Sequence, residues 1–496
     1  MNTPTLADAQ AAVDAASKTA KQDPNRPIYH AICPANWMND PNGPIAINGE
    51  IHVFYQHNPF KADWGPMYWG HMKSKDMVYW THLPIAFGPS WDSENGCWSG
   101  CCVQGADDLP RALYTSVGPD RPALTDSEQW LAIGSQDMAK WKKFKGNPVM
   151  THKLHSGLRI EDWRDPCAWR EGGSYYCAVG GHLVQDDTPK NNPSVFLYKS
   201  PDLVRWQFVG VLYTRFHDKI DADADENVKL GTNWECPLFF PLGDKHVLEV
   251  SVNGTAYSIG EFKNNRFTAG RWHALDNSAT FYAPNTFADF QGRRIIIGWV
   301  LARGNGTWNG CFSLPRVVAA RPNGTLSIEP IPELAKLRDK HLHRDALSIP
   351  PNTSIPMFDE KSFSSFTKTR ALECAFQVDM TQKVGEKPVP PAFDVQVYAF
   401  KKVTSVMGCV GYEPEDSLLF LGNKSGPFTI ETGEESLNAR LFIDRQVVEI
   451  YVNNRWALTH VIEITPDQAI KLVVSSQEAP VELRNMDCWN LKSINM

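Results

Sequence analysis

The sequence predicts an all-β fold: a five-bladed β-propeller followed by a β-sandwich, with a short helical extension at the N-terminus. Three observations predict it. A seven-residue pattern, Ser-x-Asp-[Met/Leu]-x-x-Trp, occurs three times, beginning at Ser74, Ser135 and Ser200. A run rich in β-forming residues precedes each copy, such as EIHVFYQH before the first. After residue 345 the chain changes to short alternating segments separated by turn residues.

The predicted N-terminal extension spans residues 1–24 and contains a short Ala-rich helix. Thr5 is a suitable N-cap, and Asp8 falls in the first turn, where a carboxylate is favourable. The segment has neither the basic start nor the apolar core of a secretory signal. We therefore expect the protein to be cytoplasmic.

The predicted propeller spans residues 25–343. Its three repeat copies are spaced by about 60 residues, a period typical of propeller blades with long loops. Five such units fit into this part of the chain. The alternative is a β-sandwich in which similar Asp/Trp turns recur by chance, and three copies in phase disfavour it.

The predicted β-sandwich spans residues 344–496. Pro350, Pro351 and Pro356 mark a linker at its start, and segments such as ALECAFQVDM and ARLFIDRQVVEIYVNN then alternate as strands do. This part shows no cluster of catalytic residue types, so we expect it to pack against the propeller. A free edge of its sheet allows a homodimer.

Composition excludes several classes of function. The net charge is −7 with no strongly basic domain, which argues against a nucleic-acid partner. No apolar run approaches the ~18 residues that a membrane span needs. The 11 cysteines, an odd number, fit a reduced chain better than a disulfide framework. The 14 histidines form no recognisable metal-ligand motif, so we predict no metal site and no cofactor.

Three acidic motifs carry the candidate chemistry: Asp40 in WMNDPNG, Asp165 in RDP and Glu235 in WECP. The inner strands of a propeller meet at a central channel, so acids far apart in sequence can converge there. The apolar neighbours of Glu235 are expected to desolvate it and raise its pKa, as a general acid requires. Amide donors in the turn are expected to keep Asp40 ionised. One protonated and one ionised carboxyl group are the requirement for glycoside cleavage.

Each motif also has a structural interpretation. Asp-Pro-Asn-Gly is usually a turn, and Arg164 beside Asp165 is usually an ion pair at a strand end. In the catalytic interpretation, Arg164 keeps Asp165 ionised and oriented to accept hydrogen bonds from sugar hydroxyl groups. Residue types alone leave both interpretations open.

The chain resembles glycoside hydrolase family 32, the invertase and fructosidase family, over nearly its whole length. The three acidic motifs occur in that family's order and spacing. Five further segments match: FYQHNP (54–59), WGPMYWGHMKSKDMVYWTHLPIA (64–86), WSG (98–100), FYAPNTF (281–287) and GCFSLPR (310–316). The family's fold is a five-bladed propeller followed by a β-sandwich, in agreement with the repeats.

The resemblance implies a role for each acid. Asp40 matches the nucleophile that attacks the anomeric C2 of a fructosyl unit, and Glu235 matches the acid/base. Asp165 matches the residue that stabilises the transition state, supported by Arg164. The carboxyl groups of nucleophile and acid/base are then expected to lie ~5–5.5 Å apart. Further residues match the fructose pocket and its mouth: Asn39, Gln56, Trp64, Trp98, Ser99, Tyr282 and Trp299.

The implied function is that of a retaining β-fructofuranosidase. Such an enzyme cleaves the terminal fructosyl unit of sucrose or short fructans through a covalent fructosyl-enzyme intermediate. The alternatives are a fructosyltransferase that makes fructo-oligosaccharides by transfructosylation, a sucrose-6-phosphate hydrolase, and a non-catalytic sugar-binding protein. The segment beginning at Trp64 favours exo action. Cys101 and Cys102 replace small residues near the expected pocket and are expected to influence the choice between water and a sugar as acceptor.

Overall fold

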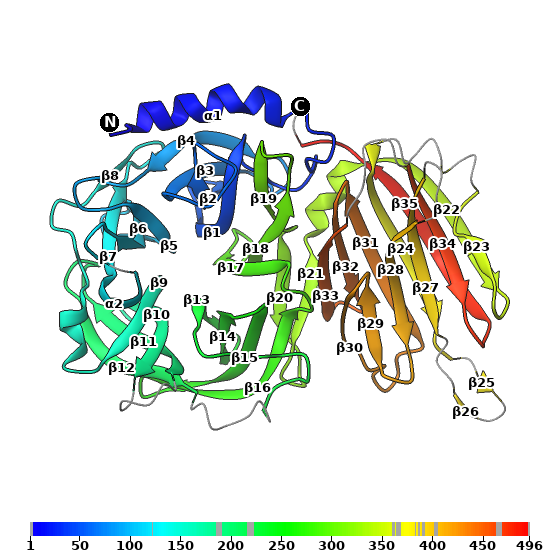
Figure 1. Cartoon of the computed structure of the whole chain (residues 1–496). Helices are drawn as coiled ribbons and strands as arrows, with labels where there is room; N and C mark the ends of the chain where they lie inside the picture. The colour runs from blue at the N-terminus through cyan, green and yellow to red at the C-terminus, as the bar shows by residue number, and fades with distance from the viewer. Residues whose placement is uncertain are drawn as a thin grey trace.

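The computed structural model describes most of the chain as a β-propeller and a β-sandwich lying side by side (Figure 1). The described residues are 3–121, 123–184, 191–215, 223–359, 363, 369–381, 383–384, 387–388, 392–400, 405–462 and 469–494. The predicted fold class is therefore confirmed. Within these ranges, no helix combines the length and the apolar character that a membrane span requires.

Three of the five propeller blades are separate four-stranded antiparallel sheets. Blade 2 contains β5 (Gly96–Gln104), β6 (Pro110–Val117), β7 (Glu128–Gly134) and β8 (Trp141–Lys143). Blade 3 contains β9 (Ile160–Glu171), β10 (Ser174–Val184), β11 (Asn191–Ser200) and β12 (Gln207–Thr214). Blade 4 contains β13 (Glu235–Leu242), β14 (Lys245–Ser251), β15 (Thr255–Lys263) and β16 (Arg266–Asp276). The short elements α2 (Ala123–Asp126) and η1 (His152–His155) lie in connections.

Blades 1 and 5 belong to one nine-stranded sheet, and this union closes the ring. Blade 1 contains β1 (Asn36–Ile47), β2 (Glu50–Asn58), β3 (Tyr68–Ser74) and β4 (Thr81–Phe87). Blade 5 contains β17 (Phe281–Ala288), β18 (Arg294–Arg303), β20 (Arg316–Ala320) and β21 (Leu326–Pro330). The extra strand β19 (Trp308–Phe312) pairs antiparallel with β18 and parallel with β1, so it joins the last blade to the first.

The repeated Ser-x-Asp pattern forms the turn between the third and fourth strands of blades 1, 2 and 3. In the first copy, the Asp76 carboxylate accepts hydrogen bonds from the backbone N–H groups of Val78 and Tyr79. The indole of Trp80 donates to the backbone carbonyl of Met77, which has a left-handed φ of 61°. The other two copies repeat the indole-to-carbonyl bond. The pattern is therefore turn chemistry that is repeated in three of the five blades.

The C-terminal sandwich consists of two six-stranded sheets. The first contains β22 (Arg338–Ile349), β24 (Ala371–Asp379), β31 (Ser436–Asp444), β32 (Val447–Val452), β33 (Trp456–Val461) and β35 (Val481–Leu491). The second contains β23 (Ser354–Pro356), β27 (Phe393–Phe400), β28 (Ser405–Glu413), β29 (Leu418–Leu421), β30 (Lys424–Pro427) and β34 (Ala469–Ser476). A small hairpin contains β25 (Lys383–Val384) and β26 (Lys387–Pro388).

The helix α1 (Leu6–Ala20) lies across blade 1 (Figure 1). The predicted cap is confirmed, because Thr5 and Asp8 form a reciprocal capping box. The helix buries Ala9 and Val13, and Gln10 accepts a hydrogen bond from the backbone of Ile85 on β4.

The start of the sandwich differs from the predicted boundary between residues 343 and 344. The short helix η2 (Pro332–Leu337) ends the propeller, and β22 pairs with β35 from Arg338 onward. The predicted boundary therefore falls inside β22. The prolines that suggested a linker follow this strand instead of preceding it.

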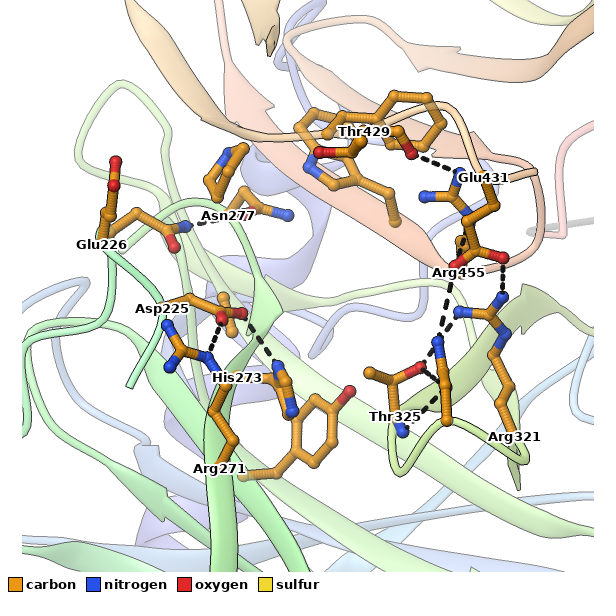
Figure 2. Close-up of a pocket in the computed structure, with 17 residues that line it drawn as sticks. Asp225, Glu226, Arg271, His273, Asn277, Arg321, Thr325, Thr429, Glu431 and Arg455 are labelled. Atoms are coloured by element: carbon orange, nitrogen blue, oxygen red, sulfur yellow. Dashed lines mark hydrogen bonds and ion pairs between the residues drawn. The ribbon is translucent and has the colours of Figure 1, made fainter. Parts of the chain in front are cut away.

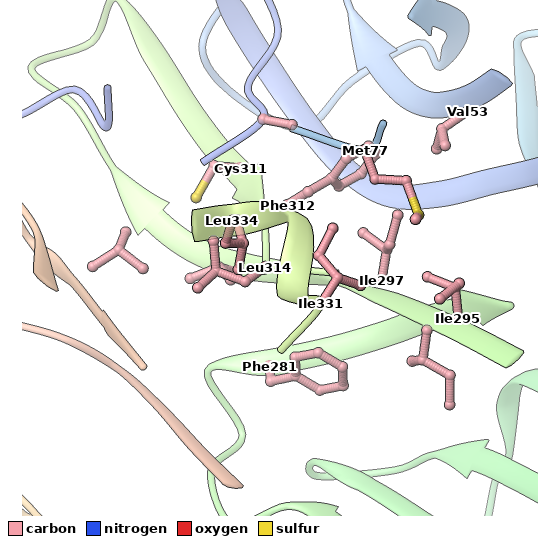
Figure 3. Close-up of a cluster of buried hydrophobic side chains, with 14 of the residues drawn as sticks. Val53, Met77, Phe281, Ile295, Ile297, Cys311, Phe312, Leu314, Ile331 and Leu334 are labelled. Carbon is pink, nitrogen blue, oxygen red and sulfur yellow. The ribbon is translucent and has the colours of Figure 1, made fainter. Parts of the chain in front are cut away.

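A single apolar core connects the first blade, the last blade and the sandwich. Met77 of the first repeat turn, Phe312 of β19 and Leu334 of η2 meet in this cluster (Figure 3). The same cluster includes Phe442 of the sandwich. The core thus holds the ring closed and attaches the second domain to it.

Candidate active site

All five inner strands carry an irregularity in register at the same level of the propeller. These strands, β1, β5, β9, β13 and β17, lie next to one another around the axis. The bulged positions are Asn39-Asp40, Trp98-Ser99, Asp165-Pro166, Cys236-Pro237 and Ala283-Pro284. Bulges re-aim side chains and are common beside active sites. Three of these bulges contain a proline. Proline has no backbone N–H, and a bulge tolerates it because a bulged residue makes no ladder hydrogen bond.

The backbone at these bulges is strained at three positions. Asp165, Cys236 and Ala283 have φ values of 64°, 47° and 43°, in the left-handed region that residues with side chains rarely adopt. Each such residue costs about 1–3 kcal/mol and persists where the surrounding structure enforces it. A small cavity on the axis is lined by residues from all five inner strands, including Ser99 and Asp165.

Asp40 is held by three donors. Its Oδ2 accepts from the Ser99 hydroxyl at 2.5 Å and lies 3.6 Å from the Cys236 thiol, while Oδ1 accepts from the Asn39 amide at 2.9 Å. Burial raises the pKa of Asp40, the Ser99 and Asn39 hydrogen bonds oppose this, and the charge of Glu235 raises the pKa further. The turn WMNDPNG therefore presents one oriented carboxylate to the channel.

Asp165 lies beside the same cysteine. Its Oδ2 accepts a hydrogen bond of 2.9 Å from the backbone N–H of Cys236, and its own backbone N–H donates to Thr115. Burial raises the pKa of Asp165 to about 6, although the charge of Arg164 and the Cys236 N–H lower it. Cys236 thus touches two acids and is bonded to the third in the chain, so the three motifs meet at one place.

Glu235 has a different environment from the one the sequence predicts. Its side chain is 32% exposed, and it accepts hydrogen bonds from Arg164 and from the Tyr282 hydroxyl at 2.6 Å. The predicted desolvation by its chain neighbours is wrong, because neighbouring residues in a strand point to opposite faces. Trp234 is fully buried in a separate apolar cluster. The most desolvated acids are Asp40 and Asp165.

Arg164 connects the acids to a residue that sequence reasoning missed. Its guanidinium bonds to Glu235 and to Asp162, and lies 3.6 Å from the Asp165 carboxylate. Asp162 is nearly buried and also accepts from the Asn233 amide. The sequence offered only the presence of Asp162 two residues before Arg164 in EDWRDP, because the strand register is interrupted between Glu161 and Arg164 and regular alternation does not apply there.

Aromatic side chains form one wall beside the acids. The Trp98 ring lies 5.8 Å from the Arg164 guanidinium and 6.0 Å from the Trp64 ring. Trp64 is 59% exposed and lies at the solvent side of this wall. On the other side, Trp299 lies 6.5 Å from Tyr282 and 5.8 Å from Trp37. Such faces suit the apolar surfaces of a sugar ring.

Two sets of predicted residues lie one layer below this surface. Gln56 is 2% exposed and donates to the backbone carbonyl of Cys97, so it supports the inner strand of blade 2. Cys101 and Cys102 pack between blades, where a side chain at Gly43 would collide with Cys102. The expected influence of these two cysteines on the acceptor therefore finds no support in their positions.

A cavity of about 420 Å³ lies elsewhere, between the propeller and the sandwich (Figure 2). Most of its charged groups pair with one another. Asp225 pairs with Arg271 and His273, and Glu431 pairs with Arg321. None of the three motif acids lines it. Its size alone gives no chemistry, so the axial site is the better candidate.

Comparisons with known proteins show the family of the chain. A family model described as the glycosyl hydrolases family 32 N-terminal domain matches residues 30–330. The chain is 35% identical over 339 residues to the sucrose-6-phosphate hydrolase of Escherichia coli, covering 64% of this chain and 66% of that protein. It is 31% identical over 407 residues to the β-fructofuranosidase insoluble isoenzyme 1 of Oryza sativa subsp. indica, covering 72% of this chain and 67% of that protein. The solved structure of the Bombyx mori GH32 β-fructofuranosidase BmSUC1 is similar with a TM-score of 0.77 and 25% identity, covering 99% of each chain.

Proposed function

The chain belongs to glycosyl hydrolase family 32 and is a glycoside hydrolase, and from this premise we propose that it is a retaining β-fructofuranosidase acting on sucrose or short fructans. One observation carries the proposal: three carboxyl groups from three blades converge around Cys236. A pure binding protein has no need of carboxylates buried at this cost.

In the proposed first step, the Asp40 carboxylate attacks C2 of the fructosyl unit. The bond from C2 to the departing oxygen breaks, and Glu235 gives that oxygen its proton. The product is an ester between Asp40 and the fructosyl unit. The hydrogen bonds from Ser99 and Asn39 leave Asp40 one orientation from which to attack.

In the proposed second step, Glu235 removes a proton from water, the water oxygen bonds to C2, and the ester breaks. Two displacements at C2 give net retention. Arg164 and Tyr282 each hold one oxygen of Glu235, which orients it for both proton transfers. Asp165, fixed by the Cys236 N–H, is placed to accept hydrogen bonds from sugar hydroxyl groups as positive charge develops at C2.

The chemical test uses concentrated sucrose and measures free glucose and free fructose over time. Equal amounts identify water as the acceptor. Glucose in excess of fructose identifies transfructosylation, the second candidate, which uses the same three acids. A parallel assay with sucrose 6-phosphate compares kcat/KM and distinguishes a hydrolase of the phosphorylated sugar. If none of these substrates nor a short fructan is cleaved, the proposal is wrong.

The nucleophile is tested by Asp40→Asn. We expect kcat to fall by at least about a thousandfold while the circular dichroism spectrum stays close to wild type and Tm is not lowered. The isosteric amide keeps the shape of the site but cannot form the ester. Retention of about a tenth of the wild-type rate would contradict the assignment.

We also propose that the protein works in a reducing compartment, the cytoplasm. The ten cysteines whose side chains the structure describes are all unpaired, and most of them are buried. The homodimer that a free sandwich edge allows stays a prediction, and sedimentation velocity checks it.

A further inference from the structure

Two histidines and an aspartate meet on the outer face of the sandwich. His341 and His343 lie on the edge strand β22, and Asp487 lies on the adjacent strand β35. We propose that these three side chains form a binding site for one divalent transition-metal ion of the zinc class. The site belongs to a different sheet from the proposed catalytic acids, so it stands independently of the proposed function.

Strand geometry brings the three groups together. Residues two apart in a strand share a face, so His341 and His343 point to the same side of β22. The antiparallel register places Asp487 opposite His343 and Trp489 opposite His341. Met486 and Cys488, which alternate with them on β35, face the sandwich core. The three side chains therefore lie on the solvent-facing side of the sheet.

The potential ligand atoms converge on one point. His341 Nε2 lies 2.7 Å and His343 Nδ1 lies 2.8 Å from the same oxygen, Oδ1 of Asp487. All three ligand atoms lie within 4.8 Å of one another. First-row metal ions bind such atoms at about 2.0–2.2 Å, so small side-chain rotations place an ion between them.

Both imidazole rings are already held in place. The His341 ring stacks on Trp489, with ring centres 4.9 Å apart and planes inclined by 6°. The second ring nitrogen of His343, Nε2, lies 3.0 Å from the Asp345 carboxylate. Histidines that bind metals usually donate their other N–H to a carboxylate in this way, which fixes the tautomer and strengthens the ligand. A proton held on Nε2 by Asp345 leaves the lone pair of Nδ1 of His343 for the ion, which would lie between Nδ1 and Asp487.

The donor set selects the class of ion. Two imidazole nitrogens and one carboxylate oxygen suit zinc, nickel or copper, whereas calcium and magnesium prefer oxygen ligands alone. The histidine side chains are 45% and 44% exposed, so water has access to the remaining coordination position. A bound ion would connect the edge strand to its neighbour and stabilise the folded sandwich.

The test is equilibrium dialysis of chelator-treated, full-length protein against zinc chloride. We expect one tightly bound ion per chain and a rise in Tm with zinc. His341→Ala and His343→Ala should each abolish this binding. Asp345→Asn should weaken it about 10- to 100-fold without removing a ligand, because Asp345 acts only through His343. Lys340→Ala, an exposed neighbour on the same strand, is the matched control and should bind as the wild type does.

Two results would overturn the proposal. One is the absence of zinc binding at concentrations up to about 1 mM. The other is unchanged affinity and stoichiometry in both histidine variants, which would place the ion at other residues. Circular dichroism in the absence of zinc shows that each variant is folded, and sucrose cleavage without zinc should be unchanged in all of them.

Discussion

At the scale of single residues, Asp165 combines a strained backbone with an unfavourable environment for its charge. It has a left-handed φ of 64°, and burial raises its pKa to about 6 against the opposing effects of Arg164 and the Cys236 N–H. Both features cost folding free energy. If position 165 had only a structural role, an uncharged residue there would avoid this cost. The retention of Asp165 is therefore a physical reason to assign it a function.

The Asp165 pKa leads to a prediction about activity and pH. The proposed role requires the carboxylate, so kcat/KM should fall as pH drops through about 6. Asp165→Asn should lower kcat/KM by at least about a hundredfold and flatten this acid limb. A pH–rate profile of both proteins checks this. An unchanged acid limb in the variant would assign it to another group.

Ionisation of Asp165 is expected to lower the stability of the folded protein, although the proposed activity requires it. The folded-state pKa lies above the ordinary value of 3.8, so the stability present below pH 3.8 is lost as pH rises through about 6. The loss is about 3 kcal/mol at pH 7. Asp165→Asn should therefore raise Tm at pH 7 and lose this advantage near pH 4. Thermal melts at the two pH values measure the difference.

Asp162 is predicted to be a positioning residue that acts through Arg164. Asp162→Asn removes one of the three carboxylates that share the Arg164 guanidinium, which then interacts more strongly with Glu235. We expect kcat to fall about tenfold with little change in KM, because Glu235 is then misaligned for proton transfer. Glu161→Gln is the matched control, since Glu161 pairs with Arg159 and His182 instead. A purely structural role would lower Tm without this selective loss of kcat.

At the scale of elements, the repeated turn and the five bulges have opposite effects on regular strand pairing. The Ser-x-Asp turn satisfies backbone N–H groups at the outer side of three blades. The bulges interrupt pairing on the inner strands and turn side chains such as Asp40 and Ser99 toward the axis. In these three blades, a stable turn at one end allows the inner strand to be irregular where the chemistry lies.

The third copy of the turn provides a test of this stabilisation. Burial alone would raise the pKa of Asp202, but hydrogen bonds from Arg205 and Val204 outweigh it and lower the pKa to about 2. Asp202→Ala should cost about 1 kcal/mol at pH 7. Because the folded pKa is depressed, this cost should shrink as pH falls toward 2. Asp202→Asn, which keeps an acceptor oxygen, should lose less, and urea unfolding compares the two.

At the scale of the whole molecule, a buried ionic network joins the propeller to the sandwich. His30 bonds to Asp444 and Glu449, and Arg316 pairs with Glu449 and Asp276. All five side chains are fully buried. Such a network satisfies its members only when both domains are docked, so it favours one relative orientation.

This network predicts a loss of stability in alkali. Burial alone would lower the pKa of His30, but Asp444 and Glu449 raise it to about 9. A raised folded pKa gives stability that is full below pH 6.5 and lost as pH rises through about 9. The difference in unfolding free energy between wild type and His30→Gln should therefore shrink by about 3 kcal/mol over this range. Denaturant unfolding at pH 6.5 and pH 9.5 measures it, and a constant difference would contradict the assignment.

The sequence by itself determined features that depend on near neighbours in the chain. Examples are the repeat turns, the Thr5 cap and the three acidic motifs. Each depends on fewer than about ten consecutive residues, which is the range over which turn and capping interactions act. They were sufficient to predict the architecture and to select Asp40, Asp165 and Glu235 as candidates.

Only the tertiary structure decided the environment of each group. Whether an acid in a strand is desolvated depends on which blade faces it, so Asp165 is buried while Glu235 is partly exposed beside Arg164. His343 and Asp487 meet although 144 residues separate them. The physical reason is that β-sheet neighbours are set by register between distant strands, and a shift of one residue exchanges the two faces.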